Sequence, residues 1–315
     1  MNDPKVEMIQ ALQLMAIELG RKPTRDEFVA AHYHREKITA LFGSYATLCQ
    51  AAGVLDPSGK RIKFSADQIF YKSVEQQVEE HEPVLVESSK TKERILVIGD
   101  THFPFVHGPT LERIYEFAKK EKPTIIIQVG DLLDLYAQSK FPRSLNHYGP
   151  EEEERLGMEM ATEMWSTLRK LCPKTQCYQL LGNHDVRPIK RVLEAAPSLE
   201  HVVKAHYRNL IKFEGVTTID DYRQELIIDG IIFHHGYRSQ LGSHRDYTLR
   251  NFVCGHSHKG GVVFKRLREE IIWELNAGFI GDADAKALSY TAQKIHDQTL
   301  GWGFIDEYGP RFISA

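Results

Sequence analysis

The chain has 315 residues, 42% of them hydrophobic, so it can bury a full α/β core and still carry a smaller second domain. Its formal net charge of -3 argues against a basic coat that would bind nucleic acid over the whole surface. We find neither an N-terminal signal peptide nor a run of about 18 apolar residues, and we therefore expect a cytoplasmic protein without a membrane partner. The four cysteines lack paired Cys-x-x-Cys spacing, which indicates buried thiols in a reducing compartment.

Residues 1–56 show the pattern of a small helical module. Apolar residues recur at helical spacing over roughly the first twenty positions. A second helix is expected from Thr24, because Glu27 follows three residues later and the pair can form a capping box. A third helix is expected over 38–42 and a fourth over 44–53.

The composition changes twice beyond this module. Residues 57–92 are mostly polar, which predicts a linker. Two apolar runs rich in β-branched residues follow at 95–98 and 124–129, separated by a helical pattern over 109–120. This order is typical of a strand, a crossover helix and a parallel strand buried between layers.

The remaining chain predicts one more long helix and many short strands. The helix is expected over 151–171, and a strand over 177–181 follows it. Most of the sequence beyond 225 favours strands joined by short turns. We therefore expect an α/β domain over 93–315 with a two-sheet core flanked by helices.

Five short motifs with carboxylate, imidazole and amide groups stand at the ends of the expected strands. In chain order they are Gly99-Asp100-Thr101-His102, Gly130-Asp131-Leu132-Leu133-Asp134, Gly182-Asn183-His184-Asp185, His234-His235-Gly236 and Gly255-His256-Ser257-His258. Residues two apart in an extended segment face the same way, so Asp100 and His102 can present two ligands to one side. The same holds for His256 and His258. This mixture of ligands suits two adjacent divalent transition-metal ions.

The ligand types also indicate a reaction. Asp131 is the natural bridging ligand, because a carboxylate can approach two ions and reduce their mutual repulsion. Asn183 adds a neutral amide oxygen. Two ions held by few anionic groups leave a positive centre that attracts phosphate and can acidify a bridging water. The chemistry that fits is the hydrolysis of a phosphoester.

The ordered motifs resemble the calcineurin-like metallophosphoesterase superfamily over roughly residues 93–280. The resemblance implies a four-layer α/β/β/α sandwich and a dinuclear site activated by Mn²⁺, with Fe, Zn, Ni or Co as other candidates. One ion is then expected on Asp100, His102, Asp131 and His258, and the other on Asp131, Asn183, His235 and His256. His184 is similar to the family's histidine that contacts substrate and protonates the leaving oxygen. Asp134 is similar to the acidic position of the second motif, also within the catalytic machinery.

Several residues near the motifs have two interpretations. His234 precedes the expected ligand His235 on a strand, where neighbours face opposite sides, so we expect His234 to be a core residue. Asp185 either orients His184 or caps the helix that follows. The acidic run 151–154 is expected to decorate the start of a helix.

Two positions differ from one branch of the superfamily, and the difference narrows the range of expected substrates. Protein Ser/Thr phosphatases carry Arg and Glu where this chain has Leu135 and Asp185. The resemblance therefore favours a phosphodiesterase that acts on nucleic acid or a nucleotide, with a phosphomonoesterase on small phosphorylated molecules as the alternative. Arg187 and Arg238 lie near motifs and are candidates to bind phosphate, or else solvated surface charges.

The N-terminal module has a resemblance of its own. Residues 19–28, together with the segments around 38–45 and 51–53, are similar to the helical repeat associated with homing endonucleases. That resemblance implies contact with DNA, for which the first candidates are the basic residues Arg21, Lys22, Arg25, Arg35 and Lys37. The alternative for the module is a helical bundle that mediates homo-oligomerisation or packs on the catalytic domain. For the whole protein, a further alternative is a DNA-binding regulator whose metal site serves structure or localisation.

Overall fold

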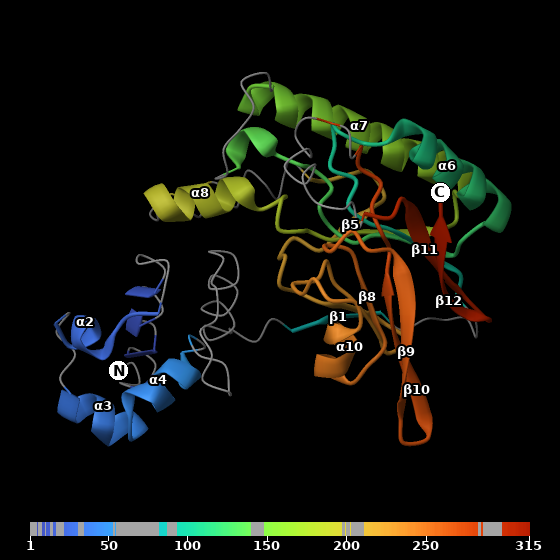
Figure 1. Ribbon diagram of the computed structural model, residues 1–315. Coiled ribbons are helices and arrows are strands. Elements are labelled where there is room, and N and C mark those ends of the chain that lie inside the picture. Colours follow the sequence, from blue (N-terminus) through green and yellow to red (C-terminus); the bar gives the residue numbers. More distant parts are fainter. Residues whose placement is uncertain are drawn as a thin grey trace. The chain divides into compact units, whose positions relative to one another are not determined.

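The computed structural model describes the chain in segments that form two units. The described residues are 22–30, 35–52, 54, 82–86, 93–139, 148–196, 199, 202, 211–282, 285 and 298–315, with scattered positions between 5 and 16. The units are Met1–His81 and Glu82–Ala315 (Figure 1). None of the helices within these segments has both the length and the hydropathy that a membrane span requires.

The first unit is helical. Its described helices are α2 (Arg25–Ala30), α3 (Arg35–Phe42) and α4 (Tyr45–Ala51). The predicted capping box is confirmed, because Thr24 N donates to Glu27 Oε2 at 2.7 Å and Glu27 N donates to Thr24 Oγ1 at 3.3 Å. Ser44 caps α4 by accepting the Thr47 N–H. The unit has its own apolar core, which includes Met8, Leu12, Phe28, Ile38 and Leu48.

The second unit contains two six-stranded sheets. The first sheet has the order β12-β11-β2-β3-β4-β5, with β2 (Ile95–Ile98), β3 (Ile125–Gln128), β4 (Gln176–Gln179), β5 (Thr217–Thr218), β11 (Gly301–Asp306) and β12 (Gly309–Ser314). Strands β2 and β3 are parallel, as predicted, and β4 pairs with β3 in the same direction. Strand β11 adds to the other side of β2 in the antiparallel sense.

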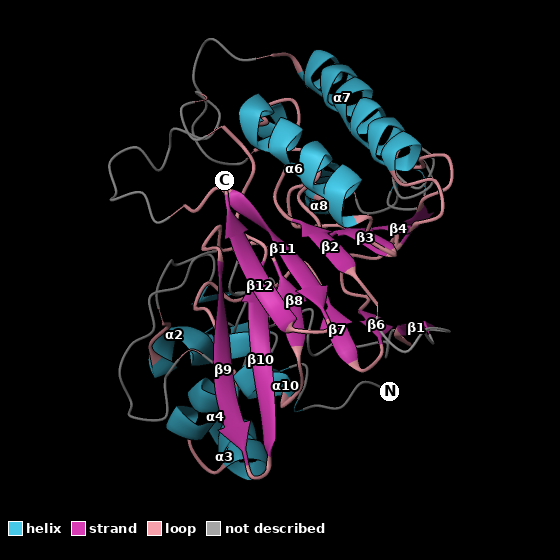
Figure 2. Cartoon of the chain, turned by 90° about the vertical axis from the view of Figure 1, so that its right-hand side faces the viewer, coloured by secondary structure: helices cyan, strands magenta, loops and turns pink. Residues whose placement is uncertain are grey.

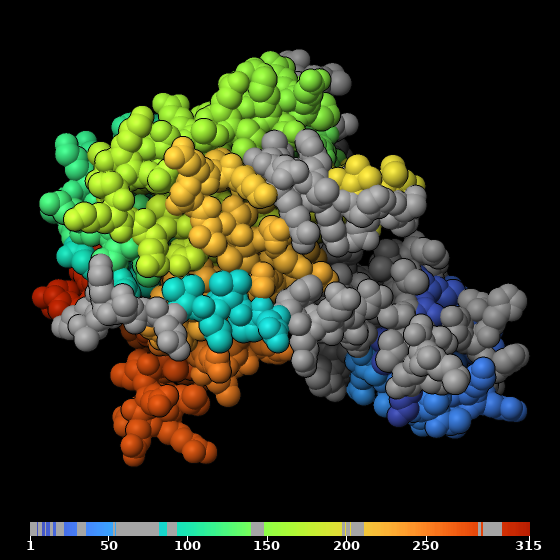
Figure 3. All heavy atoms as spheres, turned by 180° about the vertical axis from the view of Figure 1, so that it is seen from behind, coloured from blue at the N-terminus to red at the C-terminus, as the bar shows by residue number. Residues whose placement is uncertain are grey.

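The second sheet has the order β1-β6-β7-β8-β10-β9. Its strands are β1 (Val84–Val86), β6 (Leu226–Ile228), β7 (Ile231–Phe233), β8 (Phe252–Cys254), β9 (Gly261–Leu267) and β10 (Glu270–Asn276). Strand β1 lies within the segment 57–92, which the sequence predicts to be a linker, and it pairs in parallel with β6. The β9–β10 hairpin projects from the body of this unit (Figure 3). Phe264 of β9 and Ile271 of β10 are exposed.

Alternation along the strands explains the layers. Leu96 and Ile126 face the helices α6 (Gly108–Glu121) and α7 (Pro150–Leu171), which cover the outer face of the first sheet (Figure 2). Val97 on the same strand faces the second sheet. The short helix α10 (Ser243–Thr248) packs against β10. The predicted α/β/β/α sandwich is therefore confirmed.

The interior between the sheets and beneath the helices is apolar. Burying it provides most of the driving force for folding, at about 25 cal/mol per Å² of apolar surface. All four cysteines are buried free thiols, which confirms that prediction. Two further short helices, η1 (Tyr136–Gln138) and α8 (Arg187–Ala195), follow the second and third motifs.

Candidate metal centre

The five motifs all begin where a strand ends, and the carboxyl ends of β2, β3 and β4 meet at one edge of the first sheet. Strands β7 and β8 of the second sheet are also parallel and deliver the last two motifs. Left-handed backbone is frequent in these turns: φ lies between 45° and 66° at Asp100, His102, Asp131, His256 and His258. Non-glycine residues adopt this region at a cost, and such strain clusters at functional sites.

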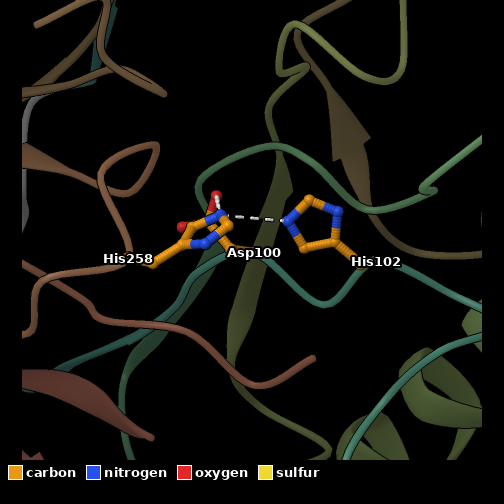
Figure 4. Close-up of side chains that lie close together, drawn as sticks. All are labelled: Asp100, His102 and His258. Atoms are coloured by element: carbon orange, nitrogen blue, oxygen red, sulfur yellow. Dashed lines mark hydrogen bonds and ion pairs between the residues drawn. The ribbon is translucent and has the colours of Figure 1, made fainter. Parts of the chain in front are cut away.

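Figure 4 shows three residues of the first group of donor atoms: Asp100 and His102 from the turn after β2, and His258 from the turn after β8. His102 Nε2 lies 3.2 Å from His258 Nε2, and His258 Nε2 lies 3.6 Å from Asp100 Oδ1. Asp131 Oδ2 is 4.0 Å from His102 Nε2. All four of these residues are expected from the sequence to hold one ion.

The second group meets around Asn183. Its Oδ1 lies 3.0 Å from His235 Nε2 and 2.8 Å from His256 Nδ1. Asp131 Oδ2 lies 3.2 Å from the same His235 nitrogen. The two groups therefore share one Asp131 oxygen, which is the position of a bridging ligand. The structure brings together all seven residues that the sequence proposes as metal ligands.

The hydrogen bonds around these rings turn lone pairs toward one another. His235 Nδ1 donates to the Val129 carbonyl at 3.1 Å, so in the neutral ring, the form that binds a metal, the Nε2 lone pair faces the Asn183 oxygen, which is also an acceptor. His102 Nδ1 donates to Asp134 Oδ1 at 2.9 Å, which leaves its Nε2 as an acceptor as well. A divalent cation can accept these converging lone pairs. A hydrogen bond from the other ring nitrogen, as at Nδ1 of His102 and His235, commonly orients an imidazole that binds metal. The donor set fits a metal.

The electrostatics agree with this conclusion. Burial raises the pKa of Asp100 to about 7. Burial opposes protonation of His235, but the Asp131 carboxylate outweighs it and raises the pKa of that imidazole to about 9, so without a cation a proton on Nε2 supplies the positive charge. Carboxylates packed together in a dry site need positive charge nearby. Among the described residues, the sets that could hold a metal ion include Asp100-His102-His258 and Asp100-Asp131-His235.

Asp134 lies beside this centre and accepts hydrogen bonds from two imidazoles. Its Oδ1 is 2.9 Å from both His102 Nδ1 and His184 Nδ1. Arg187 donates from Nη1 to the Asp134 carbonyl at 2.6 Å and from Nη2 to His184 Nε2 at 2.9 Å. Burial, and next the Arg187 charge, lower the pKa of His184. His184 is thus a neutral ring held between a carboxylate and a guanidinium.

Asp185 has neither of the two roles that the sequence suggests. Its carboxylate accepts the N–H groups of Leu132, Leu133 and Gly182. It does not cap α8, where no side-chain cap is present. Asp185 instead ties the second motif to the third, which fixes Asp131 relative to the segment that carries Asn183. This long-range role has no signature in the sequence.

Glu153 is a functional neighbour that the sequence analysis misses. The acidic run 151–154 lies at the start of α7, as the sequence predicts, but Glu153 is only 2% exposed and accepts the N–H groups of Tyr136 and Ala137. It thereby holds the turn directly after Asp134. Helical spacing is the available signal, because Glu153 shares the buried face of α7 with Gly157 and Ala161.

The remaining candidates lie outside this cluster of donors. His234 is buried and its Nδ1 accepts the Gly236 N–H at 2.9 Å, as expected of a core residue. Arg238 is exposed in the loop after His235. Lys22 and Arg25 belong to the first unit, where Lys22 Nζ lies 5.8 Å from the centre of the Tyr45 ring. Arg21 lies outside the described residues.

Comparison with known families agrees with this site. The sequence model of the calcineurin-like phosphoesterases matches residues 93–289, and the model of the homing endonuclease associated repeat matches residues 3–54. The chain belongs to the calcineurin-like phosphoesterase family, whose members are hydrolases that use divalent metals.

Individual relatives are distant. The Gene 54 protein of Mycobacterium phage L5 is 27% identical over 207 residues, which span 59% of this chain and 78% of the phage protein. Among solved structures, the phosphoesterase Yfce from E. coli is 15% identical with a TM-score of 0.37, covering 70% of this chain and 92% of Yfce. A metallophosphoesterase from Sphaerobacter thermophilus is 16% identical with a TM-score of 0.36, covering 71% of this chain and 88% of that one.

Proposed function

We propose that this protein is a dinuclear metal-dependent phosphodiesterase that acts on nucleic acid, DNA foremost, or on a nucleotide. The observation that carries the proposal is the sharing of Asp131 by two groups of donors, with His184 and Arg187 directly beside them. A nucleophile, a phosphate and a leaving oxygen need to be held within one small space, and this arrangement supplies polar groups for each.

Two divalent ions, Mn²⁺ by preference, would attract the phosphate and lower the pKa of water at this site. Asp100, His102, Asp131 and His258 would hold one of them, and Asp131, Asn183, His235 and His256 the other. Side chains of the protein would bind the phosphate and transfer the proton. Arg187 carries a positive charge next to His184 and would bind a phosphate oxygen. His184 would first take up a proton from solvent at Nε2, where Arg187 now donates, and then pass it to the leaving oxygen, while Asp134 accepts the Nδ1 hydrogen.

The preference for nucleic acid rests on the N-terminal unit. Its match to the homing endonuclease associated repeat supports a DNA-contacting role. Lys22 and Arg25 are the described basic residues that we would assign to phosphate contacts, with Arg21 as a further candidate from the sequence. The cytoplasmic location and a homo-oligomeric state stay predictions.

An activity panel with Mn²⁺ tests the proposal. It compares a bis-aryl phosphodiester, an aryl phosphomonoester, single- and double-stranded DNA, RNA and cyclic nucleotides. We expect the diester to be hydrolysed faster than the monoester, and at least one nucleic acid or cyclic nucleotide to be cleaved. A faster monoester would favour the phosphomonoesterase. DNA binding without any hydrolysis would favour a non-catalytic regulator.

A further inference from the structure

A second buried cluster of titratable groups lies in the other sheet. His244 and Glu274 are each 1% exposed, and Cys254 is fully buried. Glu274 Oε1 lies 3.4 Å from His244 Nδ1, and the Cys254 sulfur lies 3.9 Å from that nitrogen and 4.0 Å from the Glu274 oxygen. An imidazole, a thiol and a carboxylate at these separations are a candidate zinc site.

The hydrogen bonds at the other ring nitrogen argue against a metal. His244 Nε2 accepts the backbone N–H groups of Tyr237 and Arg238, each at 3.1 Å. A neutral ring that accepts at Nε2 carries its proton on Nδ1, which faces the Glu274 carboxylate. A metal on Nδ1 would instead require the proton at Nε2, against two donors. The cluster is therefore a closed hydrogen-bond network.

The His244 network is anchored to two strands of the second sheet. The His244 ring stacks on Phe252 of β8, with centroids 4.7 Å apart and an interplanar angle of 7°. Glu274 belongs to β10, and its two oxygens accept the N–H groups of Gly242, His244 and Arg245. The backbone at Tyr237 and Arg238 is thus fixed to two strands, although it lies in a loop.

This fixed backbone carries an exposed cation. The Arg238 guanidinium lies 4.9 Å from the centre of the Tyr247 ring and 5.4 Å from that of Tyr237. Tyr247 is 65% exposed. Arg238 follows the candidate ligand His235 by three residues, so its Cα lies within about 11 Å of the His235 Cα, a span that a long arginine side chain can reach across. Contact with the two rings restricts a side chain that would otherwise sample many rotamers.

We propose that Arg238 binds a phosphate oxygen of the substrate and that His244, held by Glu274, is a positioning residue that fixes Arg238 for this contact. The proposal rests on the phosphoesterase function above and adds a second phosphate contact to it. A guanidinium fork matches phosphate geometry, but it contributes fully only when its direction is set beforehand.

The test is a double-mutant cycle on Mn²⁺-loaded, full-length protein. Binding of inorganic phosphate is measured by calorimetry, and KM and kcat are measured on a bis-aryl phosphodiester. We expect Arg238→Ala and His244→Leu each to raise the phosphate Kd and the KM by about tenfold, the loss of one charge-assisted contact. The double variant should be no weaker than either single variant, because both changes remove the same contact.

Three controls accompany the cycle. His244→Gln keeps an acceptor near the Nε2 position and should recover most of the phosphate affinity. Arg266→Ala removes an exposed arginine of β9 and should change nothing. Metal content should be the same in all variants.

Additive losses in the double variant, an unchanged phosphate Kd, or the loss of one metal equivalent in His244→Leu would each overturn the proposal. Failure of the proposed function is recognised separately, because wild-type protein would then hydrolyse none of the phosphoesters. The phosphate titration still decides whether Arg238 and His244 act together.

Discussion

The Asp134 carboxylate orients two imidazoles beside the candidate metal ligands. Asp134 receives the Nδ1 hydrogens of His102 and His184, so one carboxylate orients a candidate metal ligand and a candidate acid together. Burial opposes ionisation of Asp134, but hydrogen bonds from both imidazoles lower its pKa below the ordinary value. The carboxylate therefore stays charged and keeps both rings in one tautomer.

His184→Ala separates proton donation from metal binding. The variant should keep its metals, because His184 is not among the seven expected ligands. On substrates with an alkoxide leaving group it should lose about 10²–10⁴-fold in rate, the usual contribution of a general acid. On nitrophenyl esters the loss should be smaller, because that leaving group needs little protonation. Equal losses on both substrate types would remove the acid role and leave only positioning.

Glu153 predicts a measurable pH dependence of stability. Burial raises the pKa of Glu153 from the ordinary 4.5 to about 7 in the folded protein. Between these values the folded state holds a proton that the unfolded chain has released, so this residue makes stability fall as the pH rises. Glu153→Gln cannot titrate and should flatten the pH dependence of the unfolding free energy over that window. Urea unfolding of both proteins from pH 4.5 to 7.5 gives the comparison, and parallel curves would contradict it.

The turns after the strands depend on close approach of the backbone. A Cβ on Gly182 would lie 2.1 Å from Asp131 Oδ1 and 2.2 Å from the Asp131 nitrogen. A Cβ on Gly255 would lie 2.2 Å from Asp100 Oδ2. Both glycines therefore allow one motif to pack directly on a candidate ligand of another.

Gly182→Ala should displace Asp131 and lower metal content and activity together, because the new Cβ would lie 2.2 Å from the Asp131 backbone nitrogen, which cannot move aside as a flexible side chain could. Gly108→Ala is the matched control, because a Cβ there meets nothing within 4 Å and the residue begins α6. Elemental analysis and diester hydrolysis on both variants check this. Full metal content in Gly182→Ala would show that the turn can relax.

The strands that carry the first three motifs could be predicted because their β-branched runs are continuous and bounded by glycine. The C-terminal pair β11 and β12 could not be recognised in the same way. Strand β11 contains two glycines and is buried on both faces, so it shows neither alternation nor a branched run. Strand β1 has only three residues and depends on pairing with β6, far away in the sequence. The links made by Asp185 and Glu153 are equally non-local.

The two units have separate cores. The proposed function assigns the chemistry to the second unit and affinity for DNA to the first. Removing Met1–His81 leaves Glu82–Ala315 with both sheets and every candidate ligand. Hydrolysis of a small aryl diester should stay nearly unchanged. Affinity for a DNA duplex should fall and depend less steeply on salt, because fewer counterions are released.

A salt series on one labelled duplex, with size-exclusion chromatography in parallel, compares the full-length and shortened proteins. Unchanged DNA affinity together with a change from dimer to monomer would reject the DNA-binding role and favour an assembly role for the first unit.

The assignment of a dinuclear metal site depends on the position of Asp131 between the two groups of donors. Elemental analysis of wild-type and Asp131→Asn proteins, with diester hydrolysis measured on the same samples, tests it most directly. We predict two divalent ions per wild-type chain, and loss of both metal and activity in the variant, because a neutral amide cannot bridge two cations as a carboxylate does. Full metal occupancy and full activity in Asp131→Asn would contradict the account.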